Sequence, residues 1–312
     1  MTDPATPTPS AASRTLDARQ VTTLSVAVAV VLIALKAFAL GASGSVSILA
    51  SLTDSVLDLA ASLTTFYAVR WAARPGDHTH RYGHGKGEAM AALVQAGLIF
   101  ASAIFIGWEA LARMFDPRPV TGGSWAIGVV VISMVLTAGL VWTQTRSLKA
   151  SGSMAVQADR AHYAADLAAG AVVLIGVVSG AFLEAPGLDA AAGLVVAVWL
   201  FWGALSLLKG AADQLLDRET SDADRAALTT AVLADPRVGG VHQLRTRMSG
   251  TRLVAQMHID LDRALTFEAA HDIVVDAEQR VLAAFPDADV LIHADPRGPW
   301  SPAVPATPSP SP

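Results

Sequence analysis

The sequence contains no cysteine, so disulfides, thiolate zinc sites and cysteine nucleophiles are all excluded. Any metal site must therefore use His, Asp, Glu or carbonyl ligands. Charge is also scarce: 16% of the 312 residues are charged and 53% are hydrophobic, with a mean hydropathy of +0.45. A chain of this size with so little charge is too apolar for a soluble globular domain. We therefore predict a membrane protein.

The sequence has no excess of basic residues. Its formal net charge of -5 and pI near 5.9 give no electrostatic reason to expect a nucleic-acid partner. The first twenty residues lack the basic, apolar and small-residue order of a cleaved signal peptide. We predict disordered tails over residues 1–20 and over the Pro/Ser/Ala-rich residues 297–312.

Long apolar runs account for most of the chain. Crossing about 30 Å of hydrocarbon takes ~20 mostly apolar residues as a helix. Six stretches within residues 21–216 qualify, at about 21–43, 47–71, 87–113, 124–146, 156–183 and 188–212. An even number of spans places both termini on one side of the membrane.

Basic residues in the connections predict which side that is, because Lys and Arg collect in cytoplasmic loops. The connections after the second and fourth spans are basic, with Arg70, Arg74, Arg81 and Lys86 in one and Arg146, Lys149 and Arg160 in the other. The short connections after the first and fifth spans carry neither Lys nor Arg. We therefore predict a multi-pass protein of the cell (plasma or inner) membrane with both termini in the cytoplasm.

Residues 220–296 have the residue pattern of a small soluble domain. Ser221 and Asp224 form a capping-box pattern that opens a helix to about residue 234. Two strands follow, VHQLRTRM and RLVAQMHIDLD, and the second alternates apolar with polar residues, which predicts one buried face. A helical repeat then runs through Phe267, Ala270, Val274, Ala277 and Val281 before a last strand, VLIHAD. The order α-β-β-α-β predicts a two-layer α+β domain.

Two predicted spans carry matched pairs of ligand-type side chains. The pairs are Asp54 with Asp58, and His162 with Asp166. A spacing of four residues places both side chains of a pair on one helix face, so two adjacent helices offer four ligands to one ion. Ionisable groups at membrane depth are costly and usually functional, whereas the structural alternative is a carboxylate that snorkels or pairs with Lys36. Asp159 lies nearer the cytoplasmic end, where we expect a solvated or structural role.

Two further groups of histidines lie outside the spans. The loop DHTHRYGHGK contains Asp77, His78, His80 and His84, with glycines that let the backbone fold around an ion. An exposed His-rich loop without metal is the alternative. The remaining histidines are all in the soluble domain: His242, His258, His271 and His293, the last sharing a strand face with Asp295. Single histidines in such domains are usually structural, but four beside an Asp favour a metal site.

These motifs together resemble the cation diffusion facilitator family, in particular its bacterial zinc and ferrous-iron efflux branch. The resemblance covers roughly residues 20–296 and rests on DSVLD, PGDHTHRYGHGKGEAMAAL, HYAAD, QLLDR, LRTRMSG and IHADP. It implies a homodimer of six-span protomers, each with a cytoplasmic metallochaperone-like αββαβ domain for metal binding and dimerisation. It also implies alternation between inward- and outward-facing states.

The resemblance assigns roles to particular residues. The transport site is matched by Asp54, Asp58, His162 and Asp166, and a loop zinc site by Asp77, His80 and His84, with His78 outside the ligand set. A binuclear cytoplasmic site is matched by His242, His258, His271, His293 and Asp295. Ala294 replaces a polar residue of close relatives, so backbone or water is expected to complete the second ion's shell. Lys86 and Asp217 match a charged pair that links the membrane and cytoplasmic parts.

The expected function is a proton-coupled antiporter, a secondary active transporter and not an enzyme, that exports a divalent metal from the cytoplasm. Zn²⁺ is expected first and Fe²⁺ or Cd²⁺ next, because an imidazole ligand disfavours harder Mn²⁺ and Mg²⁺. An intramembrane metalloprotease is the enzymatic rival, but its His-Glu-x-x-His motif is absent from the sequence. A metal sensor or a channel is the other alternative, and metal-dependent proton release from sealed vesicles distinguishes an antiporter from both.

Overall fold

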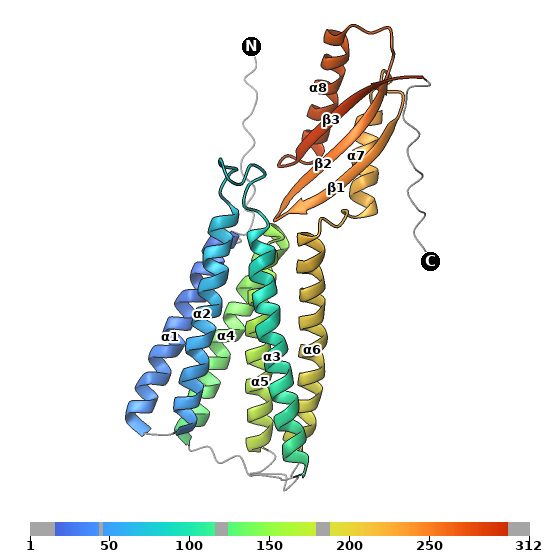
Figure 1. Ribbon diagram of the computed structural model, residues 1–312. Coiled ribbons are helices and arrows are strands. Elements are labelled where there is room, and N and C mark those ends of the chain that lie inside the picture. The colour runs from blue at the N-terminus through green and yellow to red at the C-terminus, as the bar shows by residue number, and fades with distance from the viewer. Residues whose placement is uncertain (1–15, 44–45, 116–123, 179–187, 299–312) are drawn as a thin grey trace, which may run out of the picture. The chain divides into compact units, whose positions relative to one another are not determined.

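A computed structural model describes residues 16–43, 46–115, 124–178 and 188–298. The chain folds as two compact units, one containing Met1–Trp71 and Ala91–Leu208 and the other containing Ala72–Met90 and Lys209–Pro312. Six long helices are followed by a small domain of two helices and three strands (Figure 1). The long helices are α1 (Ala18–Ser43), α2 (Val46–Ala72), α3 (Gly87–Phe115), α4 (Ser124–Ser151), α5 (Met154–Val178) and α6 (Leu188–Leu215).

Five of these helices, α1 to α4 and α6, are long and apolar enough over their described residues to cross a membrane. The exception, α5, contains Asp159, Arg160, His162 and Asp166, which lower its hydropathy at the place where the sequence predicts ligands. The prediction of a six-helix membrane domain is confirmed. Residues 179–183, the end of the predicted fifth span, lie outside the described residues.

The start of α1 differs from the sequence prediction, which assigned residues up to 20 to a disordered tail. Asp17 and Gln20 form a reciprocal cap: Gln20 N donates to Asp17 Oδ1 at 2.7 Å, and Asp17 N donates to Gln20 Oε1 at 3.2 Å. This capping box satisfies two backbone donors that a helix N-terminus otherwise leaves open. The helix consequently begins at Ala18, inside the predicted tail.

Small and polar side chains connect the long helices. Gln95 of α3 donates to Ala61 O at 3.0 Å and to Thr65 Oγ1 at 3.1 Å, both on α2. Gly193 of α6 lies so close to Ala110 of α3 that a Cβ atom would approach the alanine methyl to 3.1 Å. Hydrogen bonds and close backbone contacts of this kind hold helices together in a bilayer, where lipid offers no hydrophobic driving force between them.

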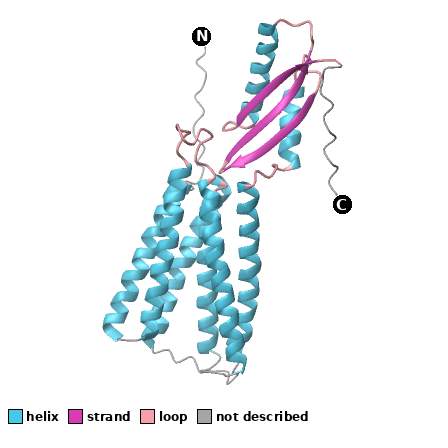
Figure 2. Cartoon of the chain, in the orientation of Figure 1, coloured by secondary structure: helices cyan, strands magenta, loops and turns pink. Residues whose placement is uncertain are grey.

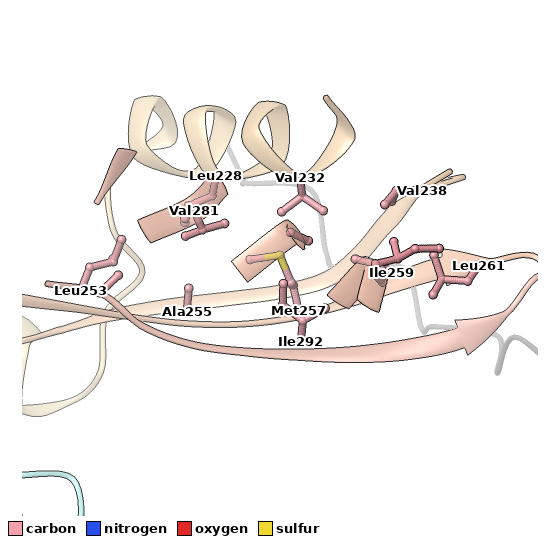
Figure 3. Packing of buried hydrophobic residues seen from close by; sticks show 13 residues of the cluster. Leu228, Val232, Val238, Leu253, Ala255, Met257, Ile259, Leu261, Val281 and Ile292 are labelled. Carbon is pink, nitrogen blue, oxygen red and sulfur yellow. The ribbon is translucent and has the colours of Figure 1, made fainter. Parts of the chain in front are cut away.

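The C-terminal domain has the predicted order: α7 (Asp222–Leu233), β1 (Val241–Ser249), β2 (Arg252–Leu261), α8 (Phe267–Ala284) and β3 (Asp289–Pro296). The sheet order is β1-β2-β3, with β1 antiparallel and β3 parallel to β2 (Figure 2). Both helices cover one face of the sheet (Figure 3). The core between them contains Leu228, Val232, Leu253, Ala255, Met257, Ile259, Leu261, Ile273, Ala277, Val281 and Ile292.

The local sequence explains both helix starts in this domain. Ser221 accepts the backbone N–H of Asp224, as the capping-box pattern predicts, and Thr266 accepts that of Ala269 at the start of α8. The predicted apolar repeat of α8 holds at Ala277 and Val281 but is wrong at Phe267, whose side chain is 90% exposed. Phe267 is the first residue of the helix, and Ile273 supplies the buried contact instead.

The loop between α2 and α3 packs against the β1–β2 hairpin. A Cβ atom on Gly85 would collide with the Ser249 carbonyl oxygen, so only glycine fits there. Gly250 in the hairpin turn has a φ of 64°, in the left-handed region that glycine adopts readily. Gln214 Nε2, at the end of α6, donates to Gly250 O at 2.7 Å. The loop, the end of α6 and the hairpin thus form one packed junction.

Candidate metal sites

Three of the four predicted transport ligands converge between α2 and α5. His162 Nε2 lies 3.1 Å from Asp58 Oδ1 and 3.7 Å from Asp166 Oδ2. One ligand atom from each of the three side chains lies within 4.8 Å of the others. Asp58 and His162 are each only 7% exposed. Two carboxylates and an imidazole at this spacing offer a divalent cation three donors before any movement of the helices.

Asp54, the fourth predicted ligand, is exposed and lies one turn before Asp58 on α2. Its carboxylate is not part of the three-residue cluster, but it lines a cavity of about 220 Å³ together with Asp58 and Asp166. Asp54 therefore lines the same cavity as Asp58 and Asp166, but its carboxylate is not close enough to join their cluster with His162. The i,i+4 spacing on each helix accounts for this placement.

Asp159 is fully buried, which corrects the expectation of a solvated role and leaves the structural one. Its Oδ2 accepts a hydrogen bond from Gln144 Nε2 of α4 at 2.8 Å, and Gln144 also donates to Ser25 Oγ of α1 at 3.1 Å. Tyr163 extends this network by donating to Ser25 O at 3.3 Å and by pairing with Ser62 Oγ of α2 at 2.7 Å. Residues from four helices are thus joined beside the cluster, an arrangement that local sequence does not reveal.

The loop ligands also come together. Asp77 Oδ2 lies 3.3 Å from His84 Nε2, and Asp77 Oδ1 lies 3.8 Å from His80 Nδ1. The backbone N–H groups of His80 and Thr79 and the Thr79 hydroxyl all donate to Asp77 Oδ1. These hydrogen bonds, first the one from His80 N, hold the pKa of Asp77 well below its usual range. Asp77 is thereby kept as a carboxylate facing the two imidazoles, a donor set that fits Zn²⁺.

The predicted charged pair forms beside this loop. Lys86 Nζ lies 2.9 Å from Asp217 Oδ1, and Arg247 Nη1 lies 3.1 Å from Asp217 Oδ2. Partial burial raises the pKa of Asp217, but the hydrogen bond from Lys86 and the charge of Arg247 outweigh it, so the net shift is downward. Asp217 has a φ of 59°, uncommon for a residue with a side chain. Sequence reasoning missed Arg247, although it lies in the LRTRMSG motif.

Asp295 is the centre of the C-terminal cluster. His258 Nδ1 donates to Asp295 Oδ2 at 2.8 Å, His242 Nε2 lies 3.2 Å from the same oxygen, and His293 Nε2 lies 3.2 Å from Asp295 Oδ1. Burial raises the pKa of Asp295, but the hydrogen bond from His258 and the neighbouring imidazoles more than offset this and lower it. His242, His258 and Asp295 have ligand atoms within 4.8 Å of one another, which fits a metal ion.

The remaining predicted members of this cluster lie differently. The rings of His293 and His258 have centroids 4.7 Å apart and planes tilted by 51°, and Ala294 is the partly buried neighbour of His293 on β3. His271 is exposed on α8 and is not among the three converging residues, so its role stays a prediction. Asp260, which sequence reasoning missed, has Oδ2 3.7 Å from His242 Nδ1. The strand period of two could have identified it, because Asp260 follows His258 on the same sheet face.

Known proteins match the chain over both units. Residues 22–216 match the family described as "Cation efflux transmembrane domain", and residues 220–297 match "Cation efflux protein, cytoplasmic domain". The Cation-efflux pump FieF of Shewanella oneidensis is 42% identical over 274 residues, which cover 87% of this chain and 92% of that protein. The Cation-efflux pump FieF of Salmonella arizonae is 38% identical over 278 residues, covering 86% and 90%. The CTD of MamM, solved in a cadmium form, is 28% identical and covers 25% of this chain and 98% of that one, with a TM-score of 0.24.

Proposed function

We propose that this chain, which belongs to the cation efflux family, is a proton-coupled antiporter that exports a divalent transition metal from the cytoplasm. The family consists of membrane transporters, not enzymes, so cation efflux itself follows from membership. The proposal of proton-coupled export of a divalent transition metal rests on the cluster of Asp58, His162 and Asp166 on two membrane helices. Such a cluster of ionisable groups at membrane depth serves to bind a cation that has lost its water.

The donor set supports a borderline metal ion as the transported substrate. One imidazole and two carboxylates, with Asp54 as a fourth ligand on movement of α2, suit tetrahedral Zn²⁺ at ligand distances of about 2.0–2.2 Å. Imidazole favours Zn²⁺, Cd²⁺ and Fe²⁺ over Mn²⁺ and Mg²⁺, which prefer oxygen ligands. Zn²⁺ is therefore the first substrate to test, and Fe²⁺ and Cd²⁺ follow.

Competition between protons and metal explains the coupling. Metal ligands must be deprotonated to bind, so metal that enters from the cytoplasm displaces protons from the site. When the site opens outward, protons from a more acidic exterior displace the metal. His162 is the natural main carrier, because an unperturbed imidazole titrates near pH ~6.5. The membrane potential adds about 2.3 kcal/mol per charge per 100 mV, so the ratio of protons to metal sets the driving force.

The loop and C-terminal sites support a regulatory or stabilising role for bound zinc. Asp77, His80 and His84 would hold one ion in the loop, and His242, His258 and Asp295 would hold another on the open face of the sheet. The match to the cytoplasmic domain of cation efflux proteins and the basic connections after α2 and α4 support cytoplasmic termini. The same domain is proposed to join two copies of the chain as a homodimer.

Transport into proteoliposomes tests the proposal. The purified protein is reconstituted, and uptake of Zn²⁺, Cd²⁺, Fe²⁺, Mn²⁺ and Mg²⁺ is measured with the lumen at pH 6 and the exterior at pH 7. We expect uptake of the first three ions, accompanied by proton release from the lumen, and loss of net uptake when a protonophore dissipates the pH gradient. Metal uptake at the same rate without any pH gradient or proton movement would exclude an antiporter and favour a channel.

A further inference from the structure

Lys36 of α1 is a buried cation beside the transport ligands. Its side chain lines the same cavity as Asp54, Asp58 and Asp166, and the residue is only 8% exposed. Lys36 is the one basic side chain among the described residues that line this cavity. A buried lysine normally pairs directly with a carboxylate, because an unpaired buried charge is costly.

The contacts of Lys36 differ from that pattern. Lys36 Nζ donates to Ser55 Oγ at 2.6 Å and to Ser51 O at 3.0 Å, both on α2. Among the described residues, no carboxylate oxygen lies within the 4.0 Å of an ion pair with Nζ. Ser51 and Ser55 are one helical turn apart, on the helix that also carries Asp54 and Asp58. The two serines therefore hold the ammonium near the ligands while leaving the carboxylate oxygens available.

We propose that Lys36 is a fixed positive counter-charge beside the transport site. Its charge weakens metal binding enough for release, and it sets the net charge of the cavity to a value that one divalent cation neutralises. This inference rests on the proposed function of the site. Metal ligands must be deprotonated to bind, and in that state, with His162 neutral, the three carboxylates and the ammonium that line the cavity leave two net negative charges, which one divalent cation neutralises. A monovalent cation leaves the cavity negative, and a second divalent cation makes it positive.

The low-dielectric surroundings of the cavity strengthen the repulsion between the Lys36 ammonium and a metal ion. Charges interact more strongly where water is scarce, so a fixed ammonium in the cavity repels an entering cation appreciably even without contact. Ligand number and geometry still favour the metal, but the repulsion lowers its affinity on both sides of the membrane. A transporter needs a moderate affinity for its ion, because an ion bound too tightly is not released.

Two substitutions with opposite expected effects test the role of Lys36. Lys36→Met removes the charge at similar length, so the KM for Zn²⁺ in proteoliposomes should fall about tenfold, and kcat should fall because release slows. Ser55→Ala keeps the charge but removes one tether, so the ammonium can reach a carboxylate and compete with metal, and the KM should rise. Lys36→Arg should resemble the parent protein. Lys149→Met, which removes an exposed lysine from the last turn of α4, is the matched control and should leave both constants unchanged.

The outcomes separate this inference from the proposed function. If the parent protein moves no divalent metal, the proposed function fails and this inference fails with it. If the parent transports Zn²⁺ but Lys36→Met leaves its KM unchanged or raises it, the counter-charge role alone is wrong. Should Lys36→Met not fold, as judged by size-exclusion chromatography, Ser55→Ala decides: a raised KM supports the role, and an unchanged or lowered KM overturns it.

Discussion

His162 Nε2 of α5 lies 3.1 Å from Asp58 Oδ1 of α2, although 104 positions separate the two residues in the chain. Asp166, one turn further along α5, completes a three-residue cluster. Each helix contributes through its own i,i+4 spacing, and the packing of the helices supplies the rest. The contact places an imidazole and two carboxylates in one position, which is what the proposed exchange of metal for protons requires.

Replacing His162 with Asp tests metal preference and coupling together. An aspartate keeps an oxygen ligand at this position but hardens the donor set, so transport of Mn²⁺ should increase relative to Zn²⁺. The two side chains differ in unperturbed pKa, ~6.5 for His and ~3.9 for Asp, so the pH profile of transport should also shift or flatten. Initial rates for both ions over an external pH series decide the question. A variant with the parent's metal preference and pH profile would mean that His162 is neither selectivity ligand nor proton carrier.

Substitutions in the C-terminal cluster should affect regulation more than translocation. His258→Ala removes the donor closest to Asp295, and we expect zinc affinity of the purified domain to fall at least about tenfold, in the range found for altered metal shells. Proton-coupled transport by the full-length variant should persist with a shifted metal dependence. Gln256→Ala, an exposed neighbour on the same sheet face, is the control. Unchanged calorimetric zinc binding by a His258→Ala, His293→Ala double variant would show that these histidines are only structural.

Gly85 and Gly97 form a matched pair for testing the junction between the loop and the hairpin. Gly85→Ala brings a Cβ atom into collision with the Ser249 carbonyl oxygen, whereas nothing lies within 4 Å of a Cβ at Gly97. We expect Gly85→Ala to increase amide hydrogen exchange in residues 72–90 and 245–253, because the loop must shift away. Gly97→Ala lies within α3 and should be neutral or stabilising by about 0.5–1 kcal/mol. Identical exchange in both variants would show that the close packing at Gly85 is not needed.

Asp235 should contribute to the stability of the C-terminal domain. It is 5% exposed and accepts hydrogen bonds from Arg237 and Arg280, and the bond from Arg237 is the main cause that lowers its pKa to about 2. Its contribution is therefore complete above the unfolded pKa of about 3.9 and is lost as the pH falls toward 2. Asp235→Asn should cost about 1–3 kcal/mol at pH 7.

Thermal unfolding of residues 220–297 at pH 7 and at pH 3 measures this effect. The difference between the parent domain and Asp235→Asn should be smaller at pH 3, because the parent has lost part of the contribution. Asp276→Asn, which removes a half-exposed partner of Arg237, should cost less than about 1 kcal/mol. Equal melting temperatures of the parent and Asp235→Asn at pH 7 would contradict the structural role.

Sequence reasoning predicted the features that depend on local pattern. The apolar runs identified the six-helix membrane domain, and the period-two alternation from Leu253 to Leu261 identified the buried face of β2. The order of elements in the C-terminal domain and the cap at Ser221 are also as predicted. These features are encoded within a few residues of one another, so one sequence is enough to reveal them.

The features that sequence reasoning missed depend on tertiary contacts. Asp159 was expected to have a solvated or structural role, and only the packing of α4 against α5 shows that it is buried and accepts a hydrogen bond from Gln144. The fixation of Lys36 by Ser51 and Ser55 requires α1 and α2 to be adjacent, which no local pattern indicates. Arg247 joins the Lys86 and Asp217 pair only because the hairpin packs on the loop. In each case the informative neighbour comes from another element of the fold.

Simultaneous measurement of metal and proton flux in an Asp58→Asn variant tests the central claim most directly. The variant, the parent protein and the control Thr53→Ala, which alters an exposed residue on the same helix, are reconstituted with a lumenal pH indicator and a zinc indicator. We predict that the parent and Thr53→Ala take up Zn²⁺ and release protons in a fixed ratio, whereas Asp58→Asn shows neither flux above protein-free vesicles. Zinc uptake by Asp58→Asn at the parent's rate, with the same proton ratio, would show that metal and protons do not exchange at this site.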